Sequence, residues 1–239
     1  MTPAVEILPD PEALAHRAAD WLLGVTKGTV GRFAIALSGG STPRRLYELM
    51  ARPPYRESFP WHRVHLFWGD ERFVPHSDAR SNFRMAQEAL LSHVPIEAAN
   101  VHPIPTEGTT PDNAARAYER TLKSFYGADE LDPARPLFDV TLLGLGEDGH
   151  TASLFPKTRA LTERERWVVA VTEGVAEPRI SLTYPPLEAS RHVVFLVAGE
   201  EKRAIFDRVR RGDPNLPAAR LRPTGGVLWL ADAAAAGNP

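Results

Sequence analysis

A histidine and an aspartate two positions apart lie in the glycine-rich segment GLGEDGHTASLFP, residues 144–156. The neutral imidazole of His150 accepts a proton near pH 7, which suits a general base that activates water. The carboxylate of Asp148 is near enough along the chain to orient that ring or to raise its basicity. The alternative is a histidine that only bonds to loop backbone, but its place in a glycine-rich loop after an apolar run favours a catalytic role.

The same segment contains a pattern that mimics a nucleotide-binding loop. Gly144, Gly146 and Gly149 match G-x-G-x-x-G after an apolar run, which is the dinucleotide fingerprint. In dinucleotide-binding folds this loop leads into a long helix, whereas Pro156 follows soon after the last glycine and would break that helix. We therefore do not expect a dinucleotide to bind here.

A second glycine-rich segment, SGGSTP, also follows a short apolar run. Gly39 and Gly40 let the backbone approach a ligand closely, and Ser41 and Thr42 supply hydroxyls. We expect Thr42 to cap a helix with Pro43 at its first position, so that the helix N-terminus helps to form a phosphate site. The alternative is an ordinary tight turn before a capped helix. The segment fits neither a P-loop nor the nucleophile elbow of serine hydrolases.

Acidic and basic side chains follow other apolar runs. The segment GDER places Asp70 and Arg72 in a predicted loop, where Arg72 can grip an oxygen-rich substrate and Asp70 can act as a base or orient the arginine. Arg179 precedes ISLTY and Lys202 begins a helix-like segment after VVFLVAG, and both can bind phosphate. The alternatives are a solvated turn with a local ion pair and plain surface charges.

The segments that carry these residues alternate with helix-like segments. Short apolar runs predict strands at 33–37, 64–68, 140–143 and 193–197, with weaker candidates at 167–171, 180–184 and 227–230. Capping residues predict helices that begin after Asp10, Ser81 and Thr110, and residues 233–236 form a C-terminal helix or a frayed tail.

This order is typical of an α/β fold with a mostly parallel central sheet and helices on both faces. We expect a single domain over residues 1–239. Ligands bind at the carboxyl ends of the strands in such folds, so the polar segments should meet at one edge of the sheet.

The composition excludes several classes of binding partner and of catalytic group. A formal net charge of −2 gives no general basic field, so we expect no nucleic acid partner. No run of about 18 uncharged apolar residues occurs and the N-terminus does not resemble a signal peptide, which predicts a cytoplasmic protein without membrane contact. The absence of cysteine removes disulfides, thiolate metal ligands and cysteine nucleophiles. His62 and His65 lack a matching ligand set, so no metal site is expected.

Taken together, ALSGGSTP, WGDERFVP with SN soon after it, LLGLGEDGHTASLFP, PRISLTYP and AGEEK resemble the 6-phosphogluconolactonase family, in this order and at similar spacing. The resemblance runs from Phe33 to Lys202 and is strongest in GLGEDGHTASLFP. It implies an α/β domain shared with glucosamine-6-phosphate deaminase and ribose-5-phosphate isomerase. It also implies hydrolysis of 6-phospho-D-glucono-1,5-lactone to 6-phosphogluconate in the oxidative pentose phosphate pathway, with no organic cofactor or required metal.

On this resemblance, His150 is the base that activates water, and Asp70 and Arg72 line the sugar. The residues that bind the phosphate are Gly39, Gly40, Ser41, Thr42, Arg179 and Lys202. The developing oxyanion needs a donor, which is Arg72 or a loop N–H. The expected partner is the phosphorylated sugar lactone, and the expected state is a monomer or a weak homo-oligomer.

Two other functions stay open. Deamination or isomerisation of a sugar phosphate would use Asp70 as its base, but the deaminase loop typically reads DGHIAFNEP, whereas TASLFP follows DGH here. A sugar-phosphate sensor without catalysis usually accompanies a DNA-binding module, for which this chain has neither the room nor a basic patch.

Overall fold

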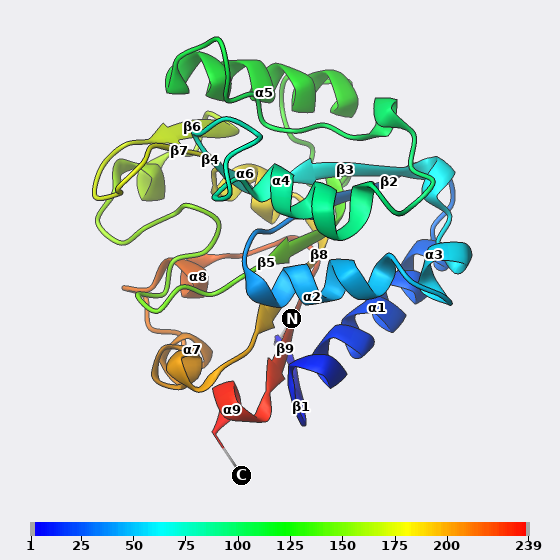
Figure 1. The fold of residues 1–239 in the computed structure, drawn as a ribbon. Helices are drawn as coiled ribbons and strands as arrows, with labels where there is room; N and C mark the ends of the chain where they lie inside the picture. Colours follow the sequence, from blue (N-terminus) through cyan, green and yellow to red (C-terminus); the bar gives the residue numbers. More distant parts are fainter. Residues whose placement is uncertain (1–2, 238–239) are drawn as a thin grey trace.

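The computed structural model describes residues 3–237, and its centre is a six-stranded sheet (Figure 1). The strands lie in the order β1-β9-β8-β5-β2-β3, and every neighbouring pair runs parallel. Their bounds are β1 Ala4–Leu8, β2 Phe33–Leu37, β3 Val64–Trp68, β5 Phe138–Leu143, β8 Ser190–Val197 and β9 Gly226–Asp232. The predicted α/β fold with a mostly parallel central sheet is confirmed.

The inner strands are buried along their length, whereas the edge strand β1 is largely exposed. All five residues of β2 are buried, and so are five of the six residues of β5. A parallel sheet is covered on both faces, so its inner strands read as continuous apolar runs that a sequence pattern detects. The pattern does not predict β1, because Glu6 interrupts its apolar residues and Val5 and Ile7 stay 36% and 49% exposed.

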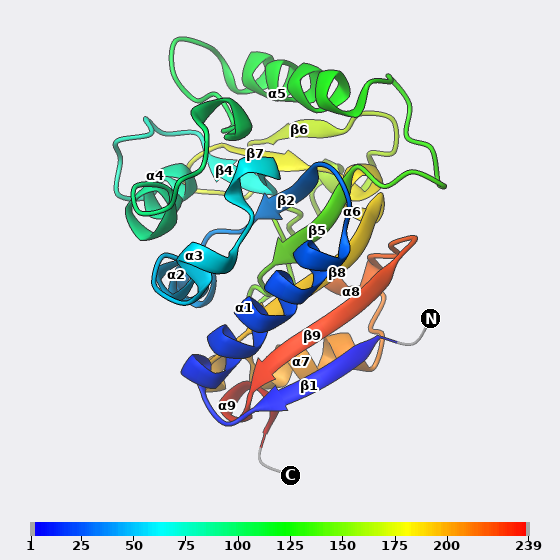
Figure 2. The ribbon, with the colours of Figure 1, turned by 90° about the vertical axis from the view of Figure 1, so that its right-hand side faces the viewer.

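Helices cover both faces of the sheet. The helices α1 (Pro11–Gly28) and α2 (Ser41–Met50) pack together on one face, and α7 (Arg203–Arg210) and α8 (Pro217–Arg220) pack on the other (Figure 1 and Figure 2). The remaining α-helices of residues 3–237 are α3 Tyr55–Ser58, α4 Asn82–Ala86, which a π-helical turn at Gln87–Leu91 continues, α5 Pro111–Tyr126, α6 Tyr184–Glu188 and α9 Ala233–Ala236. Within residues 3–237, no helix combines the length and the apolar character that crossing a membrane requires.

The helix starts follow the predicted capping residues with one exception. Asp10, Ser81 and Thr110 each accept a hydrogen bond from the backbone N–H three residues further on. The prediction that Thr42 caps α2 is wrong, because Gly40 precedes the first turn and no side chain caps it. Gly40 has a φ of 105°, which a residue with a Cβ rarely adopts. The glycine therefore lets the chain turn into α2 earlier than the hydroxyl pattern indicates.

A second, three-stranded sheet lies between the central sheet and α5 (Figure 1). Its strands, in spatial order, are β4 Asp70–Arg72, β7 Arg179–Leu182 and β6 Val168–Val171, and both pairings are antiparallel. The two weaker strand candidates at 167–171 and 180–184 belong to this sheet. The predicted loop at GDER is wrong, because β4 pairs with β7 there. Three consecutive polar residues carry no apolar alternation, so tertiary pairing rather than local pattern forms this strand.

Two buried tyrosines hydrogen-bond to the backbone at the ends of β2 and β3. The hydroxyl of Tyr47, on α2, accepts the N–H of Ser38 at 3.0 Å and donates to its carbonyl at 2.9 Å. Tyr118, on α5, makes the same two bonds to the backbone of Trp68 at 2.8 and 3.0 Å. Burial raises the pKa of both tyrosine hydroxyls, so they stay neutral. Each tyrosine satisfies backbone groups at the point where the chain leaves the sheet.

We expect Tyr118→Phe to lower the free energy of unfolding by about 1–3 kcal/mol, because the buried N–H and carbonyl of Trp68 lose their partner. Urea denaturation of the two proteins measures this difference. Thr121→Val on the same helix is the control, since its hydroxyl bonds to the carbonyl of Ala117, which keeps its helical hydrogen bond. Equal losses in the two variants would contradict this role of Tyr118.

Candidate active site

The loops after β2, β5 and β8, together with strands β4 and β7, enclose a cavity of about 290 Å³ at the carboxyl edge of the central sheet. The candidate residues that line it are Gly39, Gly40, Asp70, Arg72, His150, Arg179 and Lys202. The expectation that the polar segments meet at one edge of the sheet is confirmed. Ser41 and Thr42 lie beside the cavity in the first turn of α2, and Asp148 lies behind His150.

His150 and Asp148 form a hydrogen-bonded pair. Nδ1 of His150 lies 2.6 Å from Oδ1 of Asp148, and the same oxygen accepts the backbone N–H of His150 at 3.1 Å. Because a carboxylate only accepts, Nδ1 carries the proton and Nε2 is the nitrogen left to accept one. The imidazole also packs against Phe155, with ring centroids 4.4 Å apart. These contacts fix the tautomer and the ring orientation that a general base needs.

The Asp148 carboxyl is held in its charged form. Partial burial raises its pKa, but hydrogen bonds from the backbone N–H and the ring of His150 outweigh this, and the pKa lies below its usual value. A carboxyl whose folded-state pKa is depressed stabilises the fold above its unfolded-state pKa and loses this contribution as the pH falls through the folded-state value. The contact with His150 therefore persists at neutral pH and weakens in acid.

Two glycines of the 144–150 loop leave room for neighbouring side chains. A Cβ on Gly146 would lie 2.1 Å from Nδ1 of His150, so a side chain there would displace the imidazole. Gly149 has a φ of 82°, and a Cβ there would lie 2.8 Å from Cδ2 of Leu216. The loop leads into no α-helix before β6. The glycine spacing that mimics a nucleotide fingerprint thus serves the placement of His150.

Arg72 and Arg179 lie opposite each other in the pairing of β4 with β7. Nη1 of Arg72 donates to Oδ1 of Asn82 at 3.0 Å, and Nη2 of Arg179 lies 3.6 Å from Glu177. The Nε atoms of both arginines are buried and have no hydrogen-bond partner within residues 3–237. Burial and then the charge of Arg72 lower the pKa of Arg179. Two adjacent guanidiniums with free donors are suited to bind an oxygen-rich anion.

Asp70 is buried beside these arginines. Its Oδ2 accepts the hydroxyl of Ser153 at 2.6 Å, and the N–H of Ser153 donates to Oγ of Ser181 on β7 at 3.1 Å. The negative charge of Asp70 partly offsets the lowering of the Arg179 pKa. Sequence reasoning misses Ser153, because it meets Asp70 only through the fold and no local pattern marks the pair.

Glu71 is a second residue that the sequence pattern does not single out. Its buried carboxylate accepts the N–H groups of Arg72, Asn82 and Phe83 at 2.7 Å and the hydroxyl of Ser81 at 3.0 Å. Burial raises the pKa of Glu71, although these hydrogen bonds act in the opposite direction. The carboxylate fastens the start of α4 to β4 and so fixes the backbone that carries Arg72.

Asn82 connects β4 with the loop after β2. Its Nδ2 donates to the carbonyl of Asp70 at 2.9 Å, while its Oδ1 accepts from Arg72. A Cβ on Gly39 would lie 2.0 Å from that Oδ1, so only glycine fits where the loop passes this side chain. The SN pair after GDER is the sequence signal that points to this residue.

Lys202 reaches the cavity from a short 3₁₀ turn after β8. Its side chain is mostly buried, and Nζ lies 3.9 Å from Oε1 of Glu147. The buried carboxylate of Asp232, at the end of β9, accepts the N–H of Gly199 at 3.1 Å and that of Ala235 at 2.7 Å. Asp232 thereby positions the turn that carries Lys202.

The histidines considered for a metal lie apart from this cavity. Nδ1 of His65 is 3.2 Å from Nε2 of His102, and the two rings stack. Burial lowers the pKa of His65 and lowers that of His102 to about 4, so both rings are neutral at pH 7. In the described part of the chain, no three or more histidine, cysteine, aspartate or glutamate side chains are grouped to hold a metal ion.

Sequence comparisons connect the whole chain to known enzymes. The model of the family described as glucosamine-6-phosphate isomerases/6-phosphogluconolactonase matches residues 9–229. A 6-phosphogluconolactonase from a Nostoc species is 43% identical over 241 residues, which cover 98% of this chain and 98% of that protein. A 6-phosphogluconolactonase from Mycobacterium tuberculosis is 40% identical, with 99% of this chain and 98% of that protein covered.

Solved structures are similar over the same length. A 6-phosphogluconolactonase from Thermotoga maritima gives a TM-score of 0.83 at 29% identity, covering 96% of this chain and 99% of that one. The enzyme from Trypanosoma brucei gives 0.83 at 30% identity, covering 99% and 98%. A monomeric glucosamine-6-phosphate deaminase gives 0.82 at 19% identity, covering 99% and 100%, and this likeness extends to the fold alone.

We expect His150→Ala to raise the pKa of the Asp148 carboxyl toward its ordinary value, because the ring's hydrogen bond and charge, which lower it, are removed. Carboxyl-carbon NMR titration of both proteins measures this shift. The internal control is Asp213, whose pKa is lowered by Asn215 and Arg208 and should not change. An Asp148 pKa that stays the same would show that the pair does not form in solution.

Proposed function

This chain belongs to the glucosamine-6-phosphate isomerase/6-phosphogluconolactonase family, and we propose that it hydrolyses 6-phospho-D-glucono-1,5-lactone to 6-phosphogluconate. It is a hydrolase of the 6-phosphogluconolactonase type, as are relatives that are 41–43% identical over nearly the whole chain. Residues 1–239 act as one catalytic domain in this proposal, because both sheets contribute residues to the cavity. The reaction belongs to the oxidative pentose phosphate pathway and takes place in the cytoplasm, in a monomer or weak homo-oligomer.

The observation that carries the proposal is the His150–Asp148 pair at the cavity wall. A lactone carbonyl is already electrophilic, so hydrolysis needs a base for water rather than a covalent nucleophile. Nε2 of His150 is the proton acceptor that this step requires, and Asp148 stabilises the imidazolium that forms. A positioned base of this kind typically contributes about 10²–10⁴-fold to the rate.

In the proposed mechanism, the oxygen of water attacks C1 while His150 takes its proton. The bond between C1 and the ring oxygen then breaks, and the protonated His150 returns the proton to that oxygen. In this proposal N–H groups of the loops donate to the oxyanion, and Arg72 instead binds the phosphate together with Arg179, its partner in the pairing of β4 with β7.

The phosphate lies, in this proposal, among Arg179, Arg72 and Lys202. The free Nε donors of the two arginines and the ammonium of Lys202, whose side chain is 22% exposed, match a dianion with several acceptor oxygens. The loop Gly39-Gly40 and the first turn of α2, with Ser41 and Thr42, add backbone N–H groups at a helix N-terminus. Asp70 faces the cavity as an acceptor for sugar hydroxyls.

Deamination is the second candidate reaction, with Asp70 as its base. The sequence TASLFP after His150 points away from it. Asp70 is also engaged by Ser153, whereas His150 is oriented by a dedicated carboxylate. Assays with glucosamine 6-phosphate and with the lactone separate the two activities.

We expect His150→Ala to lower kcat for the lactone by about 10²–10⁴-fold with a much smaller rise in KM, because the base is lost and the phosphate site is kept. Side-by-side rates of the wild type and the variant measure this, after subtraction of the spontaneous hydrolysis of the lactone. Near-normal turnover of the variant would remove His150 from the mechanism.

We expect Arg179→Ala or Lys202→Ala to raise KM by roughly 10- to 100-fold, since each removes a charged hydrogen bond to the phosphate. Steady-state kinetics with the lactone measure the change. Arg159→Ala is the matched control, because this arginine is 93% exposed and pairs with Glu173 away from the cavity. Unchanged KM values in both variants would show that the phosphate site is elsewhere.

A further inference from the structure

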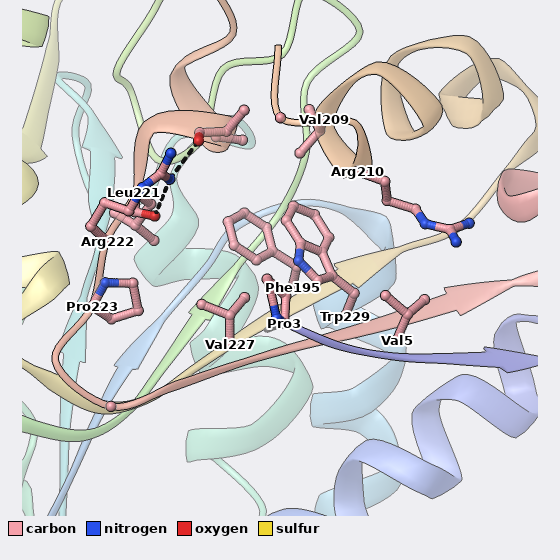
Figure 3. Close-up of a pocket in the computed structure, with 14 residues that line it drawn as sticks. Pro3, Val5, Phe195, Val209, Arg210, Leu221, Arg222, Pro223, Val227 and Trp229 are labelled. Carbon is pink, nitrogen blue, oxygen red and sulfur yellow. Dashed lines mark hydrogen bonds between the residues drawn. The ribbon is translucent and has the colours of Figure 1, made fainter. Parts of the chain in front are cut away.

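A larger cavity of about 540 Å³ lies between the strands β1, β9 and β8 and the helices α7 and α8 (Figure 3). It shares no lining residue with the cavity that contains His150. Pockets that hold small molecules typically measure roughly 300–1,000 Å³, so this space is large enough for one. The proposed hydrolysis makes no use of it.

The floor of this cavity is apolar and aromatic. The rings of Phe195 and Trp229, opposite each other on β8 and β9, stack with centroids 3.7 Å apart. Val227 and Val5 extend the floor toward the edge of the sheet, where Val5 is 36% exposed. Figure 3 shows Val227 and Val5 on either side of the two aromatic rings. Such a surface favours a ligand with an apolar body.

The charge at the rim has one sign. Two arginines and no acidic residue line the cavity, and Figure 3 shows Arg210 and Arg222 on opposite sides of the aromatic pair. Two arginines near Arg210 in the chain form ion pairs with aspartates. Arg208 pairs with Asp213 at 2.8 Å, and Arg211 pairs with Asp207 at 2.9 Å. Arg210 has no such ion pair within residues 3–237, and its guanidinium lies near the ring of Phe206 instead. Of the two arginines that line the cavity, Arg222 donates from Nη1 to the carbonyls of Ala219 and Leu221. The guanidinium of Arg210 makes no hydrogen bond within residues 3–237, so Arg210 is the cation left free for an anion.

One wall of the cavity supports the catalytic loop. Ala218, on α8, lines the cavity, and its N–H donates to the carbonyl of Gly149 at 3.0 Å. Leu216, just before α8, packs against the same glycine. Gly149 precedes His150 in the chain. A molecule that contacts α8 can therefore affect the position of the proposed base through the hydrogen bond between Ala218 and Gly149.

We propose that this cavity binds a free medium-chain carboxylate and that the bound molecule stiffens the 144–150 loop. The hydrocarbon chain lies on Phe195 and Trp229, and the carboxylate pairs with Arg210. An alcohol of the same length buries the same apolar surface but has no charge for Arg210, and an ammonium of that length is repelled by it. The ligand contacts α8 at Ala218 and restrains the hydrogen bond to Gly149.

Calorimetric titration with octanoate, octanol and octylammonium tests the site. Octanoate is expected to bind saturably at one site per chain, octanol more weakly and octylammonium more weakly still. Arg210→Gln should weaken octanoate binding roughly two- to fivefold, the range of a solvent-exposed charge pair, and leave octanol binding unchanged. Arg211→Gln is the matched control and should bind like the wild type, because its guanidinium pairs with Asp207 outside the cavity. Equal affinities in the two variants overturn the assignment of Arg210.

A second variant keeps the test independent of the charge. Val227→Trp fills the cavity from the floor and should abolish octanoate binding while the far-ultraviolet circular dichroism stays native. Failure of octanoate to bind the wild type, or its displacement by inorganic phosphate, overturns the proposal. If the wild type instead forms a concentration-dependent dimer that Val227→Trp does not form, a second copy occupies the cavity and the proposal fails.

Amide hydrogen exchange tests the link to the catalytic loop without any activity assay. Octanoate is expected to slow exchange in residues 144–150 and in α8 of the wild type, and to have no effect on Val227→Trp. Slowed exchange in α8 with an unchanged 144–150 loop would disprove the coupling through Ala218. Hydrogen exchange is measured without the lactone. A negative result therefore disproves the coupling between the cavity and the loop and leaves the proposed hydrolysis untested by this experiment.

Discussion

Where the strands of the central sheet end, backbone N–H and carbonyl groups lose the neighbouring strand that would pair with them, and buried groups of this kind need another partner. Side chains from other elements take that place, Tyr47 at Ser38 and Tyr118 at Trp68. Glu71 does the same for the first N–H groups of α4. The loops around the cavity are therefore held in shape by the protein itself. Such preorganisation lets their dipoles and charges act on a reacting molecule without first rearranging.

The same loops also make space for large side chains next to the backbone. His150 occupies the position that a Cβ on Gly146 would take, and Asn82 occupies that of a Cβ on Gly39. These two positions therefore require glycine because a side chain would clash with His150 or Asn82, whether or not the backbone also approaches a ligand there. A glycine-rich loop after a strand is therefore ambiguous in sequence, because the same composition serves both nucleotide binding and the close packing of a histidine ring against the backbone. Only the downstream residues separate the two, through Pro156 and the missing helix.

The sequence predicts an element where the local pattern alone decides the structure. β2 and β3 begin and end at the predicted residues, because both are apolar runs enclosed on two faces. β4 is not predictable in this way, since its polar residues become a strand only by pairing with β7, far along the chain. The same holds within the site: the short spacing of Asp148 and His150 reveals their contact, whereas Glu71 and Ser153 act on partners that only the fold brings near. Local spacing thus points to the proposed base, and tertiary pairing supplies the groups that hold the rest of the cavity in place.

The positive charges of Arg72 and Arg179 at the cavity are only partly compensated by neighbouring carboxylates. Arg72 and Arg179 lie side by side, and burial and mutual repulsion lower the pKa of Arg179 while Asp70 compensates only in part. In the proposed reaction a phosphate dianion relieves that repulsion and satisfies the two free Nε donors, so the strongest binding acts at the end of the substrate remote from C1. Binding energy at a remote group supports the chemical step when it holds the reacting carbon at the base. Both sheets contribute to the proposed site, because β4 and β7 of the small sheet carry Arg72 and Arg179, whereas the loops after β5 and β8 of the large sheet carry His150 and Lys202. On the proposed mechanism, a substrate that spans both parts of the site is hydrolysed efficiently, whereas a lactone without a phosphate lacks the contact that would hold its C1 at His150.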